Sequence, residues 1–131
     1  MPLLGSVGPT TTTSAPLFLL PNGTFIVDLV IFIIVLGIVE VDPGDRVRFL
    51  EEKAPQVVAT RAEAGCVDYA FSADAGDPGR VRLVERWETM GDLEAHIAAL
   101  RAGPKPAQPP VPSHMVSIDV LEAEVVTPPW A

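Results

Sequence analysis

The residues best suited to chemistry in this 131-residue chain are a histidine and a tryptophan, His96 and Trp87. A neutral imidazole beside a pocket can take a proton from a phenolic hydroxyl, which makes the aromatic ring electron-rich enough to react with O2. An indole can line such a cavity and stack on a planar substrate. Both residue types also occur as ordinary core residues, with the histidine hydrogen-bonded to backbone. The residues alone leave both interpretations open.

Three further side chains are candidates for contact with a substrate: Tyr69, Phe71 and Glu85. The Tyr69 hydroxyl could orient a substrate, and a tyrosine in a strand also serves as plain packing. Glu85 shares a strand face with the tryptophan, and a buried carboxylate needs a partner such as Arg61 or Arg86. We therefore expect a structural ion pair at Glu85.

Other kinds of site are not indicated. The single cysteine, Cys66, excludes a disulfide within the chain and a cysteine-rich zinc site, and we expect its thiol to be buried and inert. His114 follows a Pro-rich stretch and is expected at the surface. The sequence has no metal-ligand spacing, no Gly-rich phosphate loop and no nucleophile elbow. We expect neither a metal nor an organic cofactor.

The charge is unevenly distributed along the chain. Nine Lys and Arg residues against 17 Asp and Glu residues give a net charge of −8, which argues against a nucleic-acid partner. Residues 1–39 contain no Lys or Arg and only one acid, Asp28. The chain therefore consists of an apolar N-terminal segment followed by a charged domain.

The charged part predicts two helices. The first follows an Asp-Pro-Gly-Asp turn at residues 42–45 and runs to residue 64, where Gly65 ends it. Pro55 within it predicts a kink or a break into two short helices. The apolar face of this helix is expected to comprise Val47, Leu50, Ala54, Val57 and Val58.

The second helix begins at Thr89, with Asp92 at the spacing of a capping box. Its apolar face combines the candidate histidine with three aliphatic residues: Leu93, His96, Ile97 and Leu100. Residues 102–113 contain five prolines and predict an extended loop rather than a helix.

Alternating apolar and polar residues predict three strands, at residues 67–72, 81–88 and 115–126. Leu83, Glu85 and Trp87 share one face of the second strand, and Val116, Ile118 and Val120 share one face of the third. A first strand can only come from residues 35–41. The order β-α-β-β-α-β then predicts an α+β fold, a ferredoxin-like split β-α-β sheet with helices on one face.

Residues 35–126 resemble the antibiotic biosynthesis monooxygenase family, in particular its quinol monooxygenase-like group. The resemblance rests on the turn at residues 42–45 and on the motifs Arg-Ala-Glu-Ala-Gly-Cys (61–66), Glu-Arg-Trp-Glu (85–88) and Asp-Leu-Glu-Ala-His (92–96). It implies a homodimer of the dimeric α+β barrel type. Enzymes of the family oxidise quinols, phenols or haem with O2, without bound metal or flavin.

The resemblance implies a cytoplasmic, cofactor-independent monooxygenase acting on a small quinol or phenol, with catalytic residues His96 and Trp87. The pair resembles two members of the Asn/Trp/His set of haem-degrading relatives. The asparagine has no counterpart among residues 36–40, which argues against haem. Many relatives close their pocket with a short helical segment, where this chain has its Pro-rich stretch. The alternative is a dimeric binding or stress-related module of the same fold without catalysis.

Residues 17–38 resemble a second family, the membrane-anchor helix of the b subunit of bacterial ATP synthase. The resemblance implies an apolar helix or arm at residues 17–34, with membrane contact through residues 17–39. Residues 1–16 are rich in Thr, Pro and Gly and are expected to be a disordered tail. The first cations, Arg46 and Arg48, follow the apolar run, so a membrane span would leave the C-terminal domain in the cytoplasm. A membrane-anchored fusion is therefore a third hypothesis. Residues 35–41 are claimed by both families, and we favour the strand, which leaves too short a helix to span a bilayer about 30 Å thick. Residues 127–131 are expected to form a C-terminal tail.

Overall fold

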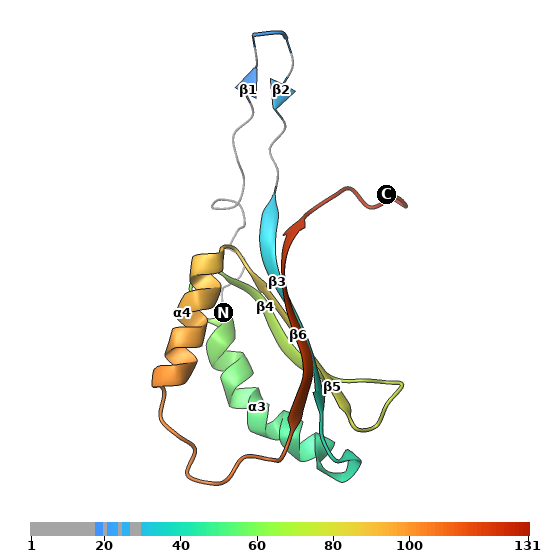
Figure 1. Ribbon diagram of the computed structural model, residues 1–131, viewed down its shortest axis with the longest axis vertical. Coiled ribbons are helices and arrows are strands. Elements are labelled where there is room, and N and C mark those ends of the chain that lie inside the picture. Colours follow the sequence, from blue (N-terminus) through green and yellow to red (C-terminus); the bar gives the residue numbers. More distant parts are fainter. Residues whose placement is uncertain (1–17, 20, 24, 27–29) are drawn as a thin grey trace.

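A four-stranded antiparallel sheet with two helices on one face forms the main body of the protein (Figure 1). The computed structural model describes residues 18–19, 21–23, 25–26 and 30–131. The strands are β3 (Ile31–Glu40), β4 (Cys66–Ala73), β5 (Arg80–Trp87) and β6 (His114–Glu124), in the order β4-β5-β3-β6. Helix α3 (Arg46–Arg61) connects β3 to β4, and α4 (Met90–Ala102) connects β5 to β6. Each crossover skips one strand, which confirms the ferredoxin-like α+β fold.

Residues 35–41, which could be a strand of the sheet or part of a membrane helix, belong to strand β3 except for Val41. Ile33 pairs with Trp87 of β5 on one side and with Glu122 of β6 on the other, so the backbone of β3 is hydrogen-bonded along both edges. The strand is apolar on both faces: Val35 and Val39 are buried on the helix-covered face, whereas Leu36 on the opposite face is 42% exposed. The predicted strand is therefore confirmed, and it begins four residues earlier than expected, at Ile31.

The expectation of an N-terminal membrane-anchor helix is wrong for the residues that the structure describes. Residues 31–39, expected to contact a membrane, are strand residues of the sheet. Upstream, the short strands β1 (Phe18–Leu19) and β2 (Phe25–Ile26) pair antiparallel with each other. No helix in the described ranges is both long and apolar enough to cross a bilayer. The expected disordered tail, residues 1–16, lies outside the described residues.

Helix α3 is continuous through Pro55, so of the predicted kink or break the break is wrong. Pro55 is exposed, and water can serve the carbonyl that loses its helical hydrogen bond. The predicted apolar face is also displaced. Val47 and Val58 are 68% and 70% exposed, whereas Phe49 and Thr60 are buried against the sheet.

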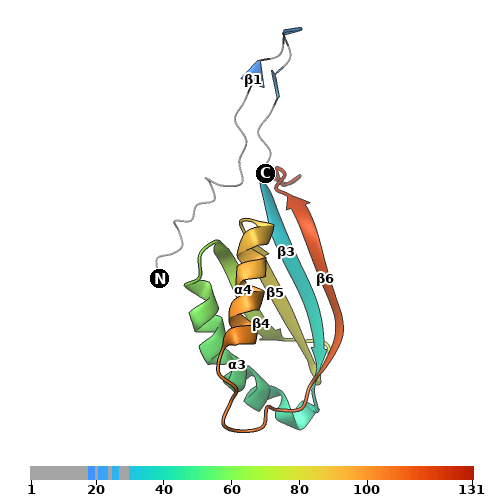
Figure 2. The same cartoon turned by 60° about the vertical axis from the view of Figure 1, so that its left-hand side comes forward.

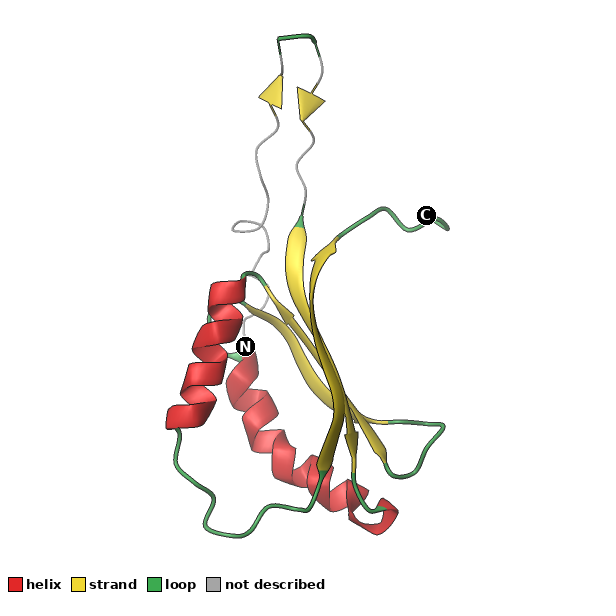
Figure 3. Cartoon of the chain, in the orientation of Figure 1, coloured by secondary structure: helices red, strands yellow, loops and turns green. Residues whose placement is uncertain are grey.

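The turn before α3 forms as predicted, because Asp42 accepts a hydrogen bond from the Gly44 amide at the start of a short 3-10 helix, η1 (Pro43–Asp45). The Thr89 cap of α4 also forms, with its side chain accepting from the Asp92 amide. Both helices cover the same face of the sheet, as Figures 2 and 3 show. The Pro-rich segment is the expected loop, and it joins α4 to the edge strand β6.

The core lies between the helices and the sheet. The alternation predicted for β5 is confirmed, since Leu83, Glu85 and Trp87 are all buried. In β6 the predicted face is interrupted, because the register with β3 shifts beside Val116, between Met115 and Ser117. Ile118 and Val120 nevertheless share the helix-covered face, opposite Gly37 and Val35 of β3.

Candidate functional site

A pocket of about 270 Å³ lies between helix α4 and the sheet. Most of its wall is apolar, and polar side chains reach it at a few points. Strands β4 and β5 contribute Tyr69, Phe71, Leu83 and Glu85, helix α4 contributes Leu93, His96, Ile97 and Leu100, and the remaining wall is formed by Val35, Gln56, Ile118 and Val120. Leu100, Ile118 and Val120 are each about half exposed, so the pocket opens between the C-terminal half of α4 and β6.

His96 projects from helix α4 toward the end of α3 and toward strand β4. It is 3% exposed, and its ring lies 5.2 Å from the Tyr69 ring and 5.0 Å from the Trp87 ring, measured between centroids. Its Nδ1 atom lies 2.8 Å from Oε1 of Glu63, which follows helix α3. The Thr89 cap fixes the start of α4, and the helical period then directs position 96 to the core.

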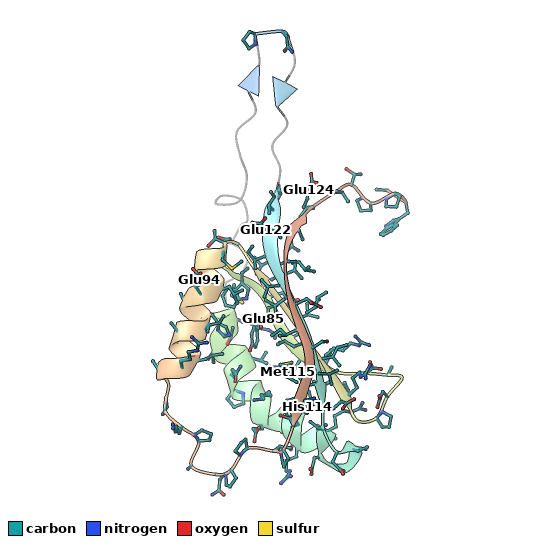
Figure 4. The ribbon with its side chains drawn as sticks, viewed as in Figure 1. Glu85, Glu94, His114, Met115, Glu122 and Glu124 are labelled. Carbon is teal, nitrogen blue, oxygen red and sulfur yellow. The ribbon has the colours of Figure 1, made fainter. Side chains whose placement is uncertain are left out.

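Glu85 lies at the base of the pocket, on the side of the sheet that α4 covers (Figure 4). Its carboxylate accepts a hydrogen bond from Nε1 of Trp87 at 2.8 Å. Burial raises the pKa of the Glu85 carboxyl, and this hydrogen bond opposes the rise only in part. The pocket therefore holds a carboxyl group that keeps its proton to higher pH than an exposed glutamate does.

The expected ion pair at Glu85 is wrong. Arg86 projects from the opposite face of β5, because neighbouring residues of a strand alternate, and its guanidinium stacks over the Phe32 ring at 3.9 Å. Arg61 donates from Nε to the backbone carbonyl of Tyr69 at 2.9 Å. Glu85 is thus paired with a neutral indole rather than with a cation.

The expectation that Trp87 lines the cavity is also wrong. Its side chain is fully buried, and it is absent from the pocket wall. The indole packs behind the His96 ring and donates to Glu85. Trp87 therefore supports the two polar side chains of the pocket and has no surface on which a substrate could stack.

Tyr69 and Phe71 reach the pocket from β4, as the alternation of that strand predicts. The Tyr69 hydroxyl accepts a hydrogen bond from Nε2 of Gln56 at 2.7 Å, and burial raises the pKa of Tyr69 to about 12. The phenol is therefore neutral at physiological pH. Phe71 packs edge-on against Tyr69, with 5.9 Å between ring centroids.

Sequence reasoning missed two polar residues of the site, Gln56 and Glu63. Gln56 could have been found as the polar side chain one turn after Lys53 on the helix face that buries Phe49 and Thr60. Glu63 gave no such signal, because it lies beyond the end of α3 and meets a histidine 33 positions away.

The remaining candidates lie outside the pocket. His114 is exposed at the start of β6. Burial, assisted by neighbouring carboxylates, raises the pKa of the Cys66 thiol to about 11. Within the described part of the chain, no group of three His, Cys, Asp or Glu residues could hold a metal ion.

The Pro-rich loop does not cover the pocket. Its residues line a different hollow together with Arg48, Glu51 and Glu52 of α3. The Val111 amide donates to Glu52 at 2.9 Å, and the Val111 side chain is buried, so the loop is fastened to α3. The pocket mouth beside β6 is left open on that side.

Residues 32–99 match the sequence model of a family described as antibiotic biosynthesis monooxygenase. The heme-degrader MhuD from Mycobacterium tuberculosis, solved with two hemes in its active site, is 21% identical with a TM-score of 0.53, and the match covers 73% of this chain and 97% of that chain. A protein from Nitrosomonas europaea described as an antibiotic biosynthesis monooxygenase is 16% identical with a TM-score of 0.53, covering 75% and 92%. One from Deinococcus radiodurans is 19% identical with a TM-score of 0.50, covering 73% and 94%. A sequence search of curated proteins gave no significant match. At these identities the structural likeness concerns the fold alone.

Proposed function

Because the chain belongs to the antibiotic biosynthesis monooxygenase family, we propose that it oxidises a small quinol or phenol with O2, without a bound metal or flavin. The observation that carries the proposal is a hydrogen-bonded histidine in the wall of an apolar pocket. Such a wall excludes water and leaves the imidazole as the base nearest to a bound aromatic ring. A volume of about 270 Å³ lies just below the usual range of ligand pockets and suits one or two aromatic rings.

In the proposed reaction the main task of the protein is to remove a proton from the substrate. His96 takes the proton of a substrate hydroxyl, so that the O–H bond breaks and an N–H bond forms, and the resulting phenolate donates electrons to O2 far more readily than the phenol. One oxygen atom enters the ring and the other leaves as water. A benzene-1,4-diol plus O2 thus yields a hydroxyquinone plus H2O, and the diol itself supplies all the electrons.

The remaining pocket residues have supporting roles in this proposal. Tyr69 and Phe71 form part of the wall against which the substrate ring packs, and Trp87 packs behind the His96 ring. Glu85, with its raised pKa, donates a hydrogen bond to a substrate oxygen while it remains protonated. The catalytic base is His96.

Oxygen uptake by the purified full chain tests the proposal, with 1,4-dihydroxynaphthalene and a panel of related quinols as probes. His96→Ala should lower the enzymatic rate by about 10²–10⁴-fold, the usual contribution of a general base. His114→Ala is the matched control, because it removes the other of the two histidines from an exposed position. Absence of uptake above the protein-free rate across the panel, or an unchanged rate in His96→Ala, would overturn the proposal.

A binding module without catalysis is the alternative of a different class. Under this hypothesis the pocket should be collapsed or filled by side chains around Trp87, whereas the pocket beside His96 is open. Quenching of tryptophan fluorescence by the same quinols, without O2 uptake, would support this alternative. Uptake that depends on His96 would exclude it.

We also propose that two copies of the chain pair through the sheet face opposite the helices. The centre of this face is apolar, and Leu36, Val84 and Leu121 remain 42%, 37% and 44% exposed. A second copy would cover these side chains and remove them from water.

Light scattering after size-exclusion chromatography tests the pairing. The wild-type chain should be a dimer, and Val84→Glu should be a monomer because it places a charge at the centre of the face. Val47→Glu, on the exposed surface of α3, is the control and should remain a dimer. A monomeric wild-type chain, or a dimeric Val84→Glu variant, would refute this arrangement.

A further inference from the structure

We propose that Glu63 is the positioning residue of His96, holding the neutral ring in the tautomer that carries its proton on Nδ1. Nε2 is then the nitrogen that can accept a proton in the pocket. The effect on turnover rests on the proposed monooxygenase function, whereas the tautomer is a property of the free protein and can be tested separately.

The geometry of the pair favours a hydrogen bond of fixed direction. Oε1 of Glu63 lies 2.8 Å from Nδ1 of His96, the distance of a charge-assisted bond. A carboxylate can only accept, so the shared proton resides on Nδ1. The His96 side chain is 2% exposed and the Glu63 side chain is 32% exposed, so the pair joins a buried ring to a carboxylate in contact with water.

The main chain at Glu63 is held by two backbone hydrogen bonds. The Glu63 amide donates to the carbonyl of Thr60 at 2.9 Å, and the Glu63 carbonyl accepts from the Cys66 amide at 3.2 Å. Both bonds belong to the tight connection between α3 and β4. The main chain at Glu63 is therefore fixed beside α4, and from this point its side chain reaches Nδ1 of His96.

The His96 ring separates two hollows. One is the apolar pocket described above, and the other is a depression of about 240 Å³ lined by Glu63, Ala64, Asp92, Ala95, His96 and Ala99. Glu63 belongs to the second hollow and does not line the first. Since Nδ1 is engaged on the Glu63 side, Nε2 remains for a ligand in the apolar pocket.

Other titratable groups around the ring do not replace Glu63. Glu85 on β5 and Tyr69 on β4 face it from the sheet, and Asp92 on α4 is occupied by the hydroxyl of Thr89. Burial raises the pKa of both Glu85 and Tyr69, which favours their neutral forms. Glu63 is the carboxylate placed to balance the positive charge that His96 gains when it takes a proton.

Nitrogen-15 NMR of the histidine rings tests the tautomer in the substrate-free protein. The chain has two histidines, so the spectrum contains His96 and the exposed His114 as an internal reference. At a pH where the ring is neutral, the wild type should show His96 protonated on Nδ1 and unprotonated on Nε2. Glu63→Ala should shift His96 toward the other tautomer, while Glu94→Ala, which removes an exposed glutamate from α4, should change nothing. A wild-type proton on Nε2, or an unchanged tautomer in Glu63→Ala, overturns the proposal.

Turnover of 1,4-dihydroxynaphthalene provides the second readout. Glu63→Ala should lower kcat by about 10- to 100-fold, as loss of a histidine's orienting partner does at metal sites, with little change in KM. Glu63→Gln retains the hydrogen-bond acceptor without the charge and should restore the tautomer but only part of kcat. An increase confined to KM would contradict a positioning role. If no variant or wild type consumes O2 while the tautomer shifts as expected, the assignment of Glu63 stands and the proposed reaction fails.

Discussion

Gly65 connects α3 to β4 beside the first turn of α4, and its replacement by alanine should destabilise the protein. Its φ of +76° lies in the left-handed region, which side chains with a Cβ adopt only at a cost. A Cβ added there would lie 2.7 Å from Cβ of Asp92 and even closer to the Asp92 carboxyl group. The Gly65 carbonyl also accepts from the Glu88 amide at 2.9 Å, so the backbone has little freedom to move away.

Two costs add in Gly65→Ala. The left-handed conformation costs alanine about 1–2 kcal/mol. Asp92 must move, which disturbs its contacts with Thr89 at the cap of α4, an effect of about 0.5–2 kcal/mol. The free energy of unfolding should therefore fall by about 1.5–4 kcal/mol.

Urea unfolding at fixed protein concentration measures this loss. The fully buried Trp87 reports unfolding by fluorescence, while Trp130 is 86% exposed and should change little. Gly91→Ala is the control: its added Cβ would meet nothing closer than Thr89 Oγ1 at 3.7 Å, and alanine in a helix should stabilise by up to about 1 kcal/mol.

A double variant separates the two costs. Asp92→Ala removes the carboxyl group, which is the part of Asp92 closest to the new Cβ, and leaves only the contact with Cβ at 2.7 Å. Gly65→Ala combined with Asp92→Ala should therefore lose less stability than the sum of the single changes. A loss below about 1 kcal/mol in Gly65→Ala, or strict additivity in the double variant, would refute the steric explanation.

Three further predictions concern the buried groups Glu85 and Cys66 and the side chain of Arg46. Burial raises the pKa of Glu85, so the folded state binds that proton more tightly than the unfolded state does. The contribution of Glu85 to stability is therefore complete below the usual carboxyl pKa and is lost as the pH rises through the raised value. Urea unfolding across this pH range should show the loss in the wild type and not in Glu85→Gln, and parallel pH profiles of the two proteins would contradict the prediction. With a pKa of about 11, Cys66 should react with maleimide at neutral pH far more slowly than free cysteine and recover its reactivity in urea, and fast labelling of the folded protein would count against burial of the thiol. Arg46 donates to three carbonyl oxygens of the β4–β5 turn, at 2.7–3.3 Å. Arg46→Ala should therefore lower the free energy of unfolding by about 2 kcal/mol and speed hydrogen exchange in that turn. The control Arg48→Ala breaks an exposed ion pair and should lower it by less than about 1 kcal/mol, and equal effects of the two changes would refute the role of Arg46 in holding the turn.

Much of the framework around the pocket was predictable from local sequence. The alternation of β5 placed Glu85 on the helix-covered face, and the Thr89 cap with its apolar period placed His96 toward the core. The 42–45 turn and the Pro-rich loop were likewise evident from residue type. These features depend on backbone geometry within a few positions, and the sequence records that geometry directly.

Which side chains contact one another in the core could not be predicted in the same way. The buried face of α3 was misjudged, because Val47 and Val58 are as apolar as Phe49 and only contact with β4 selects between them. The partner of Glu85 was expected to be an arginine and is an indole two positions along the same strand. Such choices depend on which side chains meet in space, and residue type alone leaves several combinations of similar energy.

By itself, the sequence determined an α+β chain with β-α-β-β-α-β order and a histidine on the inner face of its second helix. It could not decide whether residues 31–39 are a strand or part of a membrane helix, because an unbroken apolar run has no period that distinguishes them. The tertiary structure decided that question by hydrogen-bonding β3 to β5 and β6 along both of its edges. It also decided the pairing of His96 with Glu63, since a contact between residues 33 positions apart exists only once α4 has packed beside the end of α3.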